Sequence, residues 1–181
     1  LRDVQLRSYR RQLGVVLQDP FLFSGTIADN IRFGRPDATD EDVDAAARAI
    51  GVDRVVDRFP DGLDHVVREG GAGLSAGERQ LISIARALLA DPRILILDEA
   101  TSNIDRPSEI LIEQAFDRLL EGRTSIIIAH RLATVRRADE ILVLERGRVV
   151  QRGSEERLLA EEGPFRRLAH TLEGAPAQQV A

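Results

Sequence analysis

The fold class follows from Ile94-Leu95-Ile96-Leu97-Asp98-Glu99, where four branched apolar residues run directly into two carboxylates. An apolar run without polar alternation predicts a strand that is buried on both faces. The run Ser125-Ile126-Ile127-Ile128-Ala129, followed by His130, has the same form, and residues 107–120 between the two runs have helical periodicity. This strand-helix-strand order predicts an α/β fold with a parallel sheet covered on both faces.

The residues before this stretch add one strand and several helices. Residues 13–18 form a short apolar run that stops at Asp19-Pro20, which predicts another strand, with Gln18 at its end. Residues 26–59 have helical patterns, and Thr39 is the expected cap of one helix. Ser75 is the expected cap of another, whose apolar positions recur at helical spacing: Leu81, Ile84, Ala85, Leu88 and Leu89.

The residues after this stretch predict a hairpin and two helices. The apolar runs 141–144 and 149–150 are separated by a glycine turn, which is typical of a β-hairpin. Helical segments are expected at 154–162 and 164–172. Residues 173–181 are expected to form a disordered tail.

Composition excludes several classes of site. The chain has 181 residues, is 43% hydrophobic and contains no Cys, so a disulfide framework and a thiolate metal site are both excluded. The net charge of -5 gives no basic footprint for a nucleic-acid backbone. No apolar run approaches the roughly 20 residues that span a bilayer. All 25 basic residues are Arg, which we interpret as the coding bias of a GC-rich bacterium.

The chain starts at Leu1-Arg2-Asp3, without Met. We therefore expect it to be part of a longer protein that extends on the N-terminal side.

Four polar side chains are expected at one edge of the parallel sheet. Asp98 and Glu99 end one strand, while Gln18 and His130 end two others, and α/β sheets bind ligands at this carboxyl edge. Asp98 is suited to hold Mg²⁺ and Glu99 to polarise a water. The Gln18 amide could either bind Mg²⁺ or orient the water. Each residue taken alone also fits an ordinary polar loop.

A second candidate site is the start of the helix that Ser75 caps. In Leu74-Ser75-Ala76-Gly77-Glu78, unpaired N–H groups and the helix dipole favour an anion, and Gly77 would permit its close approach. A simple capped helix is the alternative. Gly71 to Ala76 also match the dinucleotide fingerprint G-x-G-x-x-A, but residues 64–69 are too short and charged for the buried strand that this motif requires.

In order and spacing, these residues resemble the motifs that follow Walker A in ABC ATPases. The resemblance implies a Q-loop at Gln18, the ABC signature at Leu74, Ser75, Ala76, Gly77 and Glu78, and Walker B at 94–98. It implies the catalytic base at Glu99, a D-loop at 102–105 that includes Ser102 and Asp105, and the H-switch at His130. The implied fold is a partial P-loop NTPase: a RecA-like sheet core at 91–153, an inserted helical subdomain at 20–90 and C-terminal helices at 154–172.

The match has departures and gaps. The signature has Ala76 in place of a glycine and Glu78 in place of a glutamine, while Ser75 and Gly77 agree with the family. The aromatic A-loop and the phosphate-binding loop G-x-x-x-x-G-K-[ST] are not found, and the resemblance places them upstream of Leu1.

Among ABC ATPases, residues 18–27 of the chain resemble those of multidrug and lipid exporters. The resemblance implies that Phe21, Phe23 and Glu69 couple the ATPase to a transmembrane domain, although His65 and Arg68 depart from the pattern around Glu69. It further implies ATP and Mg²⁺ as cofactors and a second ABC ATPase domain as a head-to-tail partner. The expected location is the cytoplasmic face of the membrane, with no nucleic-acid partner.

Two alternative functions share these motifs. A soluble ABC ATPase of DNA repair or translation is disfavoured by the acidic charge and by the residues from Phe21 to Ile27. A non-catalytic half-site is disfavoured by the presence of Glu99 and His130. We expect the isolated chain to be inactive because the phosphate-binding loop is absent from it.

Overall fold

The computed structural model describes residues 4–98, 104–129 and 132–174. The chain divides into two compact units, Leu1–Ile128 and Ala129–Ala181. Within the described residues, no helix is both long enough and apolar enough to cross a bilayer.

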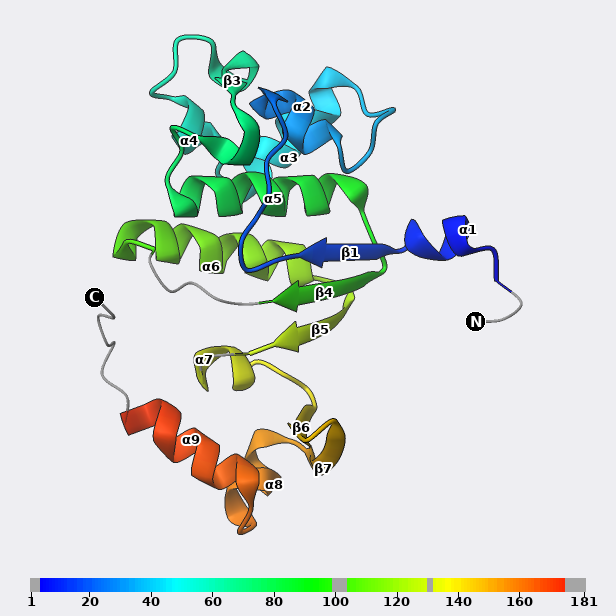
Figure 1. Cartoon of the computed structure of the whole chain (residues 1–181), viewed down its shortest axis with the longest axis vertical. Helices are drawn as coiled ribbons and strands as arrows, with labels where there is room; N and C mark the ends of the chain where they lie inside the picture. The colour runs from blue at the N-terminus through cyan, green and yellow to red at the C-terminus, as the bar shows by residue number, and fades with distance from the viewer. Residues whose placement is uncertain (1–3, 99–103, 130–131, 175–181) are drawn as a thin grey trace. The chain divides into compact units, whose positions relative to one another are not determined.

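The first unit is built on a three-stranded parallel sheet. Strands β1 (Leu13–Val16), β4 (Ile94–Asp98) and β5 (Thr124–Ile128) lie in the order β1-β4-β5, and their arrows point the same way in Figure 1. Leu97 pairs with Val16 on one side and with Ile127 on the other. The predicted parallel sheet is therefore confirmed, and the carboxyl ends of its strands share one edge.

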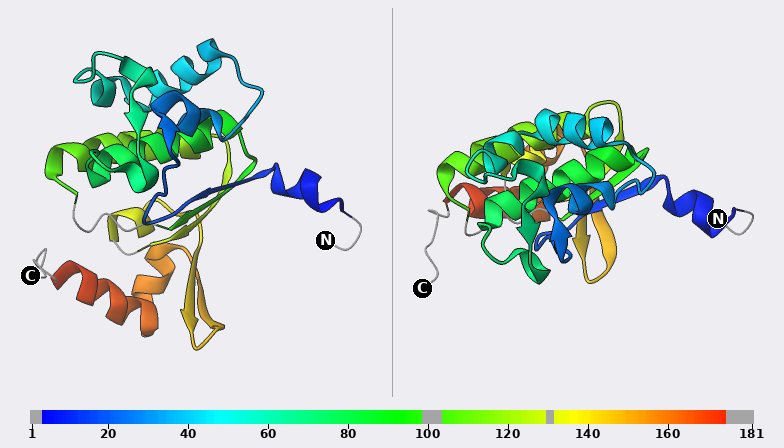
Figure 2. Two further views of the ribbon diagram at one scale, coloured as in Figure 1. Left: turned by 45° about the horizontal axis from the view of Figure 1, so that its top comes forward. Right: turned by 90° about the horizontal axis from the view of Figure 1, so that it is seen from above.

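Two long helices cover one face of this sheet. Helices α5 (Ala76–Ala90) and α6 (Arg106–Leu120) run side by side, as Figures 1 and 2 show. The inward side chains of the sheet, among them Leu95 and Leu97, are buried in one apolar core with Ile112 and Leu119 of α6.

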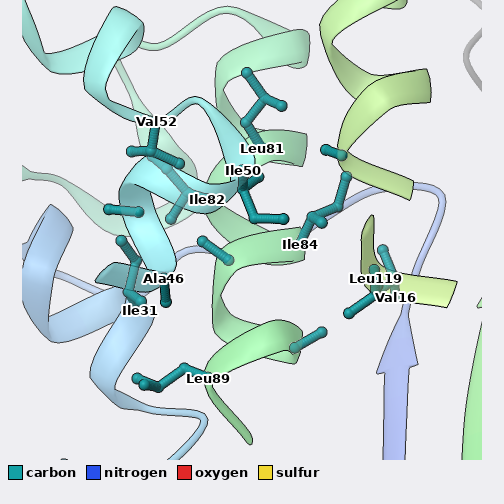
Figure 3. Close-up of a cluster of buried hydrophobic side chains, with 14 of the residues drawn as sticks. Val16, Ile31, Ala46, Ile50, Val52, Leu81, Ile82, Ile84, Leu89 and Leu119 are labelled. Carbon is teal, nitrogen blue, oxygen red and sulfur yellow. The ribbon is translucent and has the colours of Figure 1, made fainter. Parts of the chain in front are cut away.

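Helix α5 lies at the centre of the first unit. Helices α2 (Ile27–Arg32) and α3 (Asp40–Ile50) pack against it, and Figure 3 shows Ile31, Ala46 and Ile50 from these helices beside Ile82 and Ile84 of α5. Because α2, α3, α6 and β1 all contact α5, even its polar Gln80 and Ser83 are buried. The predicted apolar stripe is thus part of a helix that is buried over most of its surface.

Local sequence explains where these helices begin. Capping boxes join Thr26 to Asp29, Thr39 to Asp42 and Ser75 to Glu78, so each cap hydroxyl accepts a first-turn N–H while the acid three residues later accepts the N–H of the cap residue. The predicted caps at Thr39 and Ser75 are confirmed.

The remaining elements of the first unit are short. They are α1 (Leu6–Arg10), α4 (Asp53–Val56), the 3₁₀ turns η1 (Gly62–Asp64) and η2 (Glu69–Gly71), and the antiparallel pair β2 (Gly25–Thr26) and β3 (Val66–Val67).

The expectation that the sheet is buried on both faces is wrong for the described residues. Val15, Ile126 and Ile128, which alternate with the inward residues, are 52%, 58% and 50% exposed. A parallel sheet with apolar residues on both faces needs helices on each face, and the helices α5 and α6 of the first unit lie on only one of them (Figure 1). A continuous apolar run in a sequence indicates that both faces of a strand are apolar. It does not indicate that other elements cover both faces.

The second unit contains the predicted hairpin and helices. Its elements are α7 (Leu132–Val135), the antiparallel strands β6 (Ile141–Glu145) and β7 (Arg148–Gly153), α8 (Glu155–Ala160) and α9 (Pro164–Gly174). The hairpin is the long gold ribbon in Figure 2. A small core of Leu158, Phe165 and Ala169 holds the unit together. Helix α9 includes residues 173 and 174 of the expected tail, and 175–181 lie outside the described residues.

Candidate functional site

The carboxyl edge of the parallel sheet brings two of the predicted residues together. Asp98 is the last residue of β4, and Gln18 lies two positions beyond Val16, the last residue of the adjacent β1. Gln18 is exposed and Asp98 is partly buried. Because Val16 pairs with Leu97, Gln18 and Asp98 belong to neighbouring strand ends.

Three predicted site residues cannot be located in the same way. Glu99, Ser102 and His130 lie outside the described residues. In the sequence, Glu99 directly follows Asp98, and His130 comes two residues after Ile128, the partner of Asp98 on β5.

The edge suits a magnesium ion bound together with phosphates. Asp98 supplies a carboxylate and Gln18 an amide oxygen, and both are hard oxygen ligands. Within the part of the chain that the structure describes, no cluster of three or more His, Cys, Asp or Glu side chains could cage a metal ion. Mg²⁺ is usually held by one or two carboxylates, with phosphates and waters as its other ligands, so these donors fit it.

The helix start at Ser75 has the geometry expected of an anion site. The Ser75 hydroxyl accepts from the Glu78 N–H at 3.2 Å, and the Ser75 carbonyl accepts from the Arg79 N–H at 3.1 Å. Among the described residues, no acceptor contacts the N–H groups of Ala76 and Gly77. Two first-turn donors of a long helix are therefore unpaired at this helix start, where Ser75 is exposed and Gly77 is buried.

Gly77 has a structural role that the sequence did not reveal. A Cβ added at Gly77 would lie 2.7 Å from the Ser108 Cβ and 3.5 Å from the Ile104 side chain. Gly77 is buried, so the glycine is required because the start of α6 packs against α5 at this point. The predicted reason, close approach of an anion, is not needed to explain this glycine.

The same contact joins the signature to the D-loop. Asp105 caps α6, and its carboxylate accepts from the Ser108 N–H at 3.1 Å. The hydrogen bonds from Ser108 lower the pKa of the Asp105 carboxyl below its usual value. The starts of α5 and α6 thus lie against each other, and the two motifs form one surface although about 30 positions separate them in the sequence.

The three predicted coupling residues also come together. The Phe21 and Phe23 rings meet edge to face at 5.3 Å, and both side chains are partly exposed. The intervening Leu22 accepts at its carbonyl from the Gly70 N–H at 2.9 Å, which draws Glu69 next to this segment. Strands β2 and β3 pair just beyond.

Three residues of this surface were not predicted. Phe33 packs against Phe23 with ring centres 4.6 Å apart and the ring planes tilted by 33°. The buried Asn30 accepts from the Phe23 N–H at 2.8 Å and donates to the Phe23 carbonyl at 2.9 Å, which fixes the backbone beside the exposed aromatic rings. Arg86 of α5 contacts both Asn30 and Phe21. In the sequence, a polar Asn30 beside an apolar Ile31 does not by itself predict this network.

The dinucleotide fingerprint at Gly71 to Ala76 is excluded, as predicted. The strand before it, β3, has two residues and pairs antiparallel with β2, outside the parallel sheet. The motif therefore does not follow a central parallel strand, which a dinucleotide site requires.

Comparison with known proteins places this chain in a family. The family model described as ABC transporter matches residues 1–102, more than half of the chain. The uncharacterized ABC transporter ATP-binding protein YknV of Bacillus subtilis (strain 168) is 53% identical over 165 residues, which are 91% of this chain and 27% of that protein. The ATP-dependent lipid A-core flippase of Syntrophus aciditrophicus (strain SB) is 47% identical over 173 residues, 96% of this chain and 29% of the flippase.

A solved structure agrees with the sequence matches. A bacterial Atm1-family ABC exporter with ATP bound superposes with a TM-score of 0.85 at 40% identity, covering 97% of this chain and 31% of the exporter chain. The chain spans less than a third of the length of these relatives. The matched family, the parallel sheet with its helical layer and the order of the motifs agree, and the chain belongs to the ABC transporter family.

Proposed function

We propose that this chain is the greater part of the ATP-hydrolysing domain of an ABC exporter, which powers export of a substrate across a membrane. The observation that carries the proposal is the register of the parallel sheet: it brings Gln18 and Asp98 to one edge, and Glu99 directly follows Asp98. The helical residues 20–90, the strand residues 91–153 and the helical residues 154–172 would be its subdivisions.

The proposed reaction is attack of water on the γ-phosphorus of ATP, with ADP as the leaving group. Glu99 polarises the water, Gln18 orients it, and His130 donates a hydrogen bond to the γ-phosphate. Asp98 and Gln18 would hold Mg²⁺, which when bound neutralises charge on the phosphate oxygens. Catalysis of this kind consists mostly of positioning and charge stabilisation.

The proposed partner for catalysis is a second ABC ATPase domain, arranged head to tail. In that arrangement the signature residues Leu74 to Glu78 meet the γ-phosphate of ATP held by the other domain. The unpaired N–H groups of Ala76 and Gly77, together with the exposed Ser75, support this role. Ser102 and Asp105 of the D-loop would border the same nucleotide.

The proposed partner for transport is a transmembrane domain, which this ATPase domain would contact at the cytoplasmic face of the membrane. Phe21, Phe23 and Glu69 would meet it, and the two adjacent, partly exposed aromatic rings give that contact an apolar surface. A nucleic-acid partner remains disfavoured because the net charge is -5.

The test is Glu99→Gln in the full-length parent protein. The variant should still bind Mg-ATP, because Gln fills the same space, but its ATP turnover should fall by about 100-fold or more, as expected when a general base is lost. Glu113→Gln, an exposed position on α6, is the matched control and should leave turnover unchanged. Unchanged steady-state turnover in Glu99→Gln would remove Glu99 from the role of base.

A further inference from the structure

The signature of this chain carries the negative charge of Glu78 at the place where, in the proposed function, the negatively charged γ-phosphate has to bind. Glu78 is the third residue of α5, and its carboxylate accepts from the Ser75 N–H at 2.7 Å. This bond stabilises the start of the helix. It also holds an anionic group beside Ser75 and Gly77, the residues proposed to meet the γ-phosphate.

A cation from another part of the chain compensates this charge. Arg58 Nη2 lies 2.7 Å from the same Glu78 oxygen, and it also donates to the Gly73 carbonyl at 3.3 Å. The Glu78 side chain is only 17% exposed, so solvent screens it much less than a fully exposed acid. One guanidinium therefore binds both the acid of the signature and the loop that precedes it.

Arg58 is held in place by more than its ion pair. Its guanidinium carbon lies 4.6 Å from the centre of the Phe59 ring, and Phe59 stacks on His65 with ring centres 3.7 Å apart. A cation over an aromatic face is attracted to it, and the stack limits the positions that the ring can take. Arg58 is thus positioned at the signature before any nucleotide arrives.

We propose that Arg58 is a positioning residue of the signature: by neutralising Glu78, it allows the start of α5 to accept the γ-phosphate of ATP from the other ATPase domain. This inference rests on the proposed function. Without Arg58, the phosphate meets an uncompensated carboxylate, and two like charges within about 6 Å in a partly exposed site weaken binding by about tenfold.

The chemistry of Glu78 makes a clean test possible. A glutamine at this position keeps the side-chain oxygen that accepts from the Ser75 N–H, because both Glu and Gln complete a capping box. Glu78→Gln therefore removes the charge and preserves the helix start. Arg58→Ala removes the compensation, and the double variant removes both charges together.

The experiment measures KM for ATP and the saturating rate of ATP hydrolysis in the full-length parent. Arg58→Ala should raise KM about tenfold, and added salt should reduce this effect. Glu78→Gln leaves the charge of Arg58 uncompensated and should lower KM, and the double variant, which carries neither charge, should bring KM back to within about threefold of the parent. Arg54→Ala, the same charge change on α4, is the control and should leave KM unchanged.

Several outcomes would overturn the inference. A double variant as impaired as Arg58→Ala would mean that Arg58 acts on the nucleotide directly or only supports the local fold. An unchanged KM in Arg58→Ala would mean that neutralisation is not needed. If Arg58→Ala does not fold, Arg58→Lys takes its place: it keeps the charge and should stay within about threefold of the parent, and a tenfold rise in KM would contradict the proposal.

Failure of the proposed function would look different. In that case the parent itself would not hydrolyse ATP, or Glu99→Gln would be as active as the parent. An active parent that loses turnover in Glu99→Gln, combined with no rescue in the double variant, would refute only the role of Arg58.

Discussion

Arg86 and Asn30, which are 56 positions apart, are joined by two hydrogen bonds: Arg86 Nε donates to the Asn30 carbonyl at 2.8 Å, and Nη2 donates to the Asn30 side-chain oxygen at 3.0 Å. A third bond runs from Nη1 to the Phe21 carbonyl at 3.1 Å. Burial lowers the pKa of the Arg86 guanidinium below its usual value. The helix that begins at the signature is thus tied directly to the segment proposed to meet the membrane domain.

Arg86→Lys should destabilise the ATPase domain although it keeps the charge. The lysine ammonium cannot reproduce the planar fork that binds Asn30 and Phe21, and each hydrogen bond lost from a charged group costs about 1.5–3 kcal/mol. At about 2–4 °C per kcal/mol for a domain of this size, the thermal unfolding midpoint of the domain in the full-length parent should fall by about 3–12 °C. It can be followed by scanning calorimetry.

Arg48→Lys is the matched control for that substitution. Arg48 is 65% exposed and pairs with Asp44 one turn earlier on α3, a pair worth about 0.3–0.5 kcal/mol. Equal shifts for the two variants would show that the network around Asn30 contributes no special stability.

Gly77→Ala should destabilise the packing of α5 against α6. The added methyl group would lie 2.7 Å from the Ser108 Cβ, and overpacking of this kind costs about 1–3 kcal/mol, more than the gain from replacing a helical glycine. Chemical denaturation of the ATPase domain in the full-length parent would measure the loss. Ser108→Gly removes the opposing Cβ, so the double variant should recover stability relative to Gly77→Ala.

The absence of that recovery would point to a different cause. Gly77 would then matter through its backbone or a ligand, as the sequence alone suggested, and not through contact with Ser108.

Phe23→Ala and Glu69→Ala should uncouple transport from hydrolysis in the full-length parent. Phe23 lies in the exposed aromatic cluster, and an aromatic anchor at an interface contributes about 2 kcal/mol or more. Substrate transported per ATP hydrolysed should therefore fall about tenfold or more. Parallel transport and phosphate-release assays on the reconstituted protein measure this ratio.

Leu6→Ala is the control for the coupling variants. Leu6 is a 60% exposed apolar residue on α1, away from the aromatic cluster in sequence, and its loss should leave the ratio unchanged. If the Phe23→Ala and Glu69→Ala variants keep normal substrate-stimulated ATP hydrolysis, the assignment of a coupling role to this surface is wrong.

The isolated 181-residue chain should bind Mg-ATP too weakly to detect at ordinary concentrations. Its anion site at Ser75 offers a helix dipole and a few N–H groups, which contribute roughly 0.3–1 kcal/mol when exposed. Micromolar affinity requires about 8.2 kcal/mol. Isothermal titration calorimetry is the measurement, and a micromolar dissociation constant would show that residues of this chain are sufficient to hold the phosphates.

Local sequence by itself determined the strands of the parallel sheet, the long helices and the order of the motifs, although it did not predict α1 or the β2–β3 pair. The strand at Ile94 to Asp98, the parallel pairing with the run after Thr124 and the caps at Thr39 and Ser75 were all predicted, because strand periodicity and capping depend on residues a few positions apart. The positions of Gln18, Asp98 and Glu99 at predicted strand ends suggested their roles, and the family resemblance joined these roles into one ATPase site.

Only the tertiary structure decided which distant residues meet. Gly77 against Ser108, Arg58 on Glu78 and Arg86 on Asn30 are contacts that the folding of α5 against its neighbours creates. Periodicity identifies an apolar face but not the element that covers it, which is why the second face of the sheet was wrongly expected to be covered. Pairing between charged or polar groups far apart in the chain depends on the final packing, since many arginines and acids in this sequence could form such pairs and packing geometry selects a few.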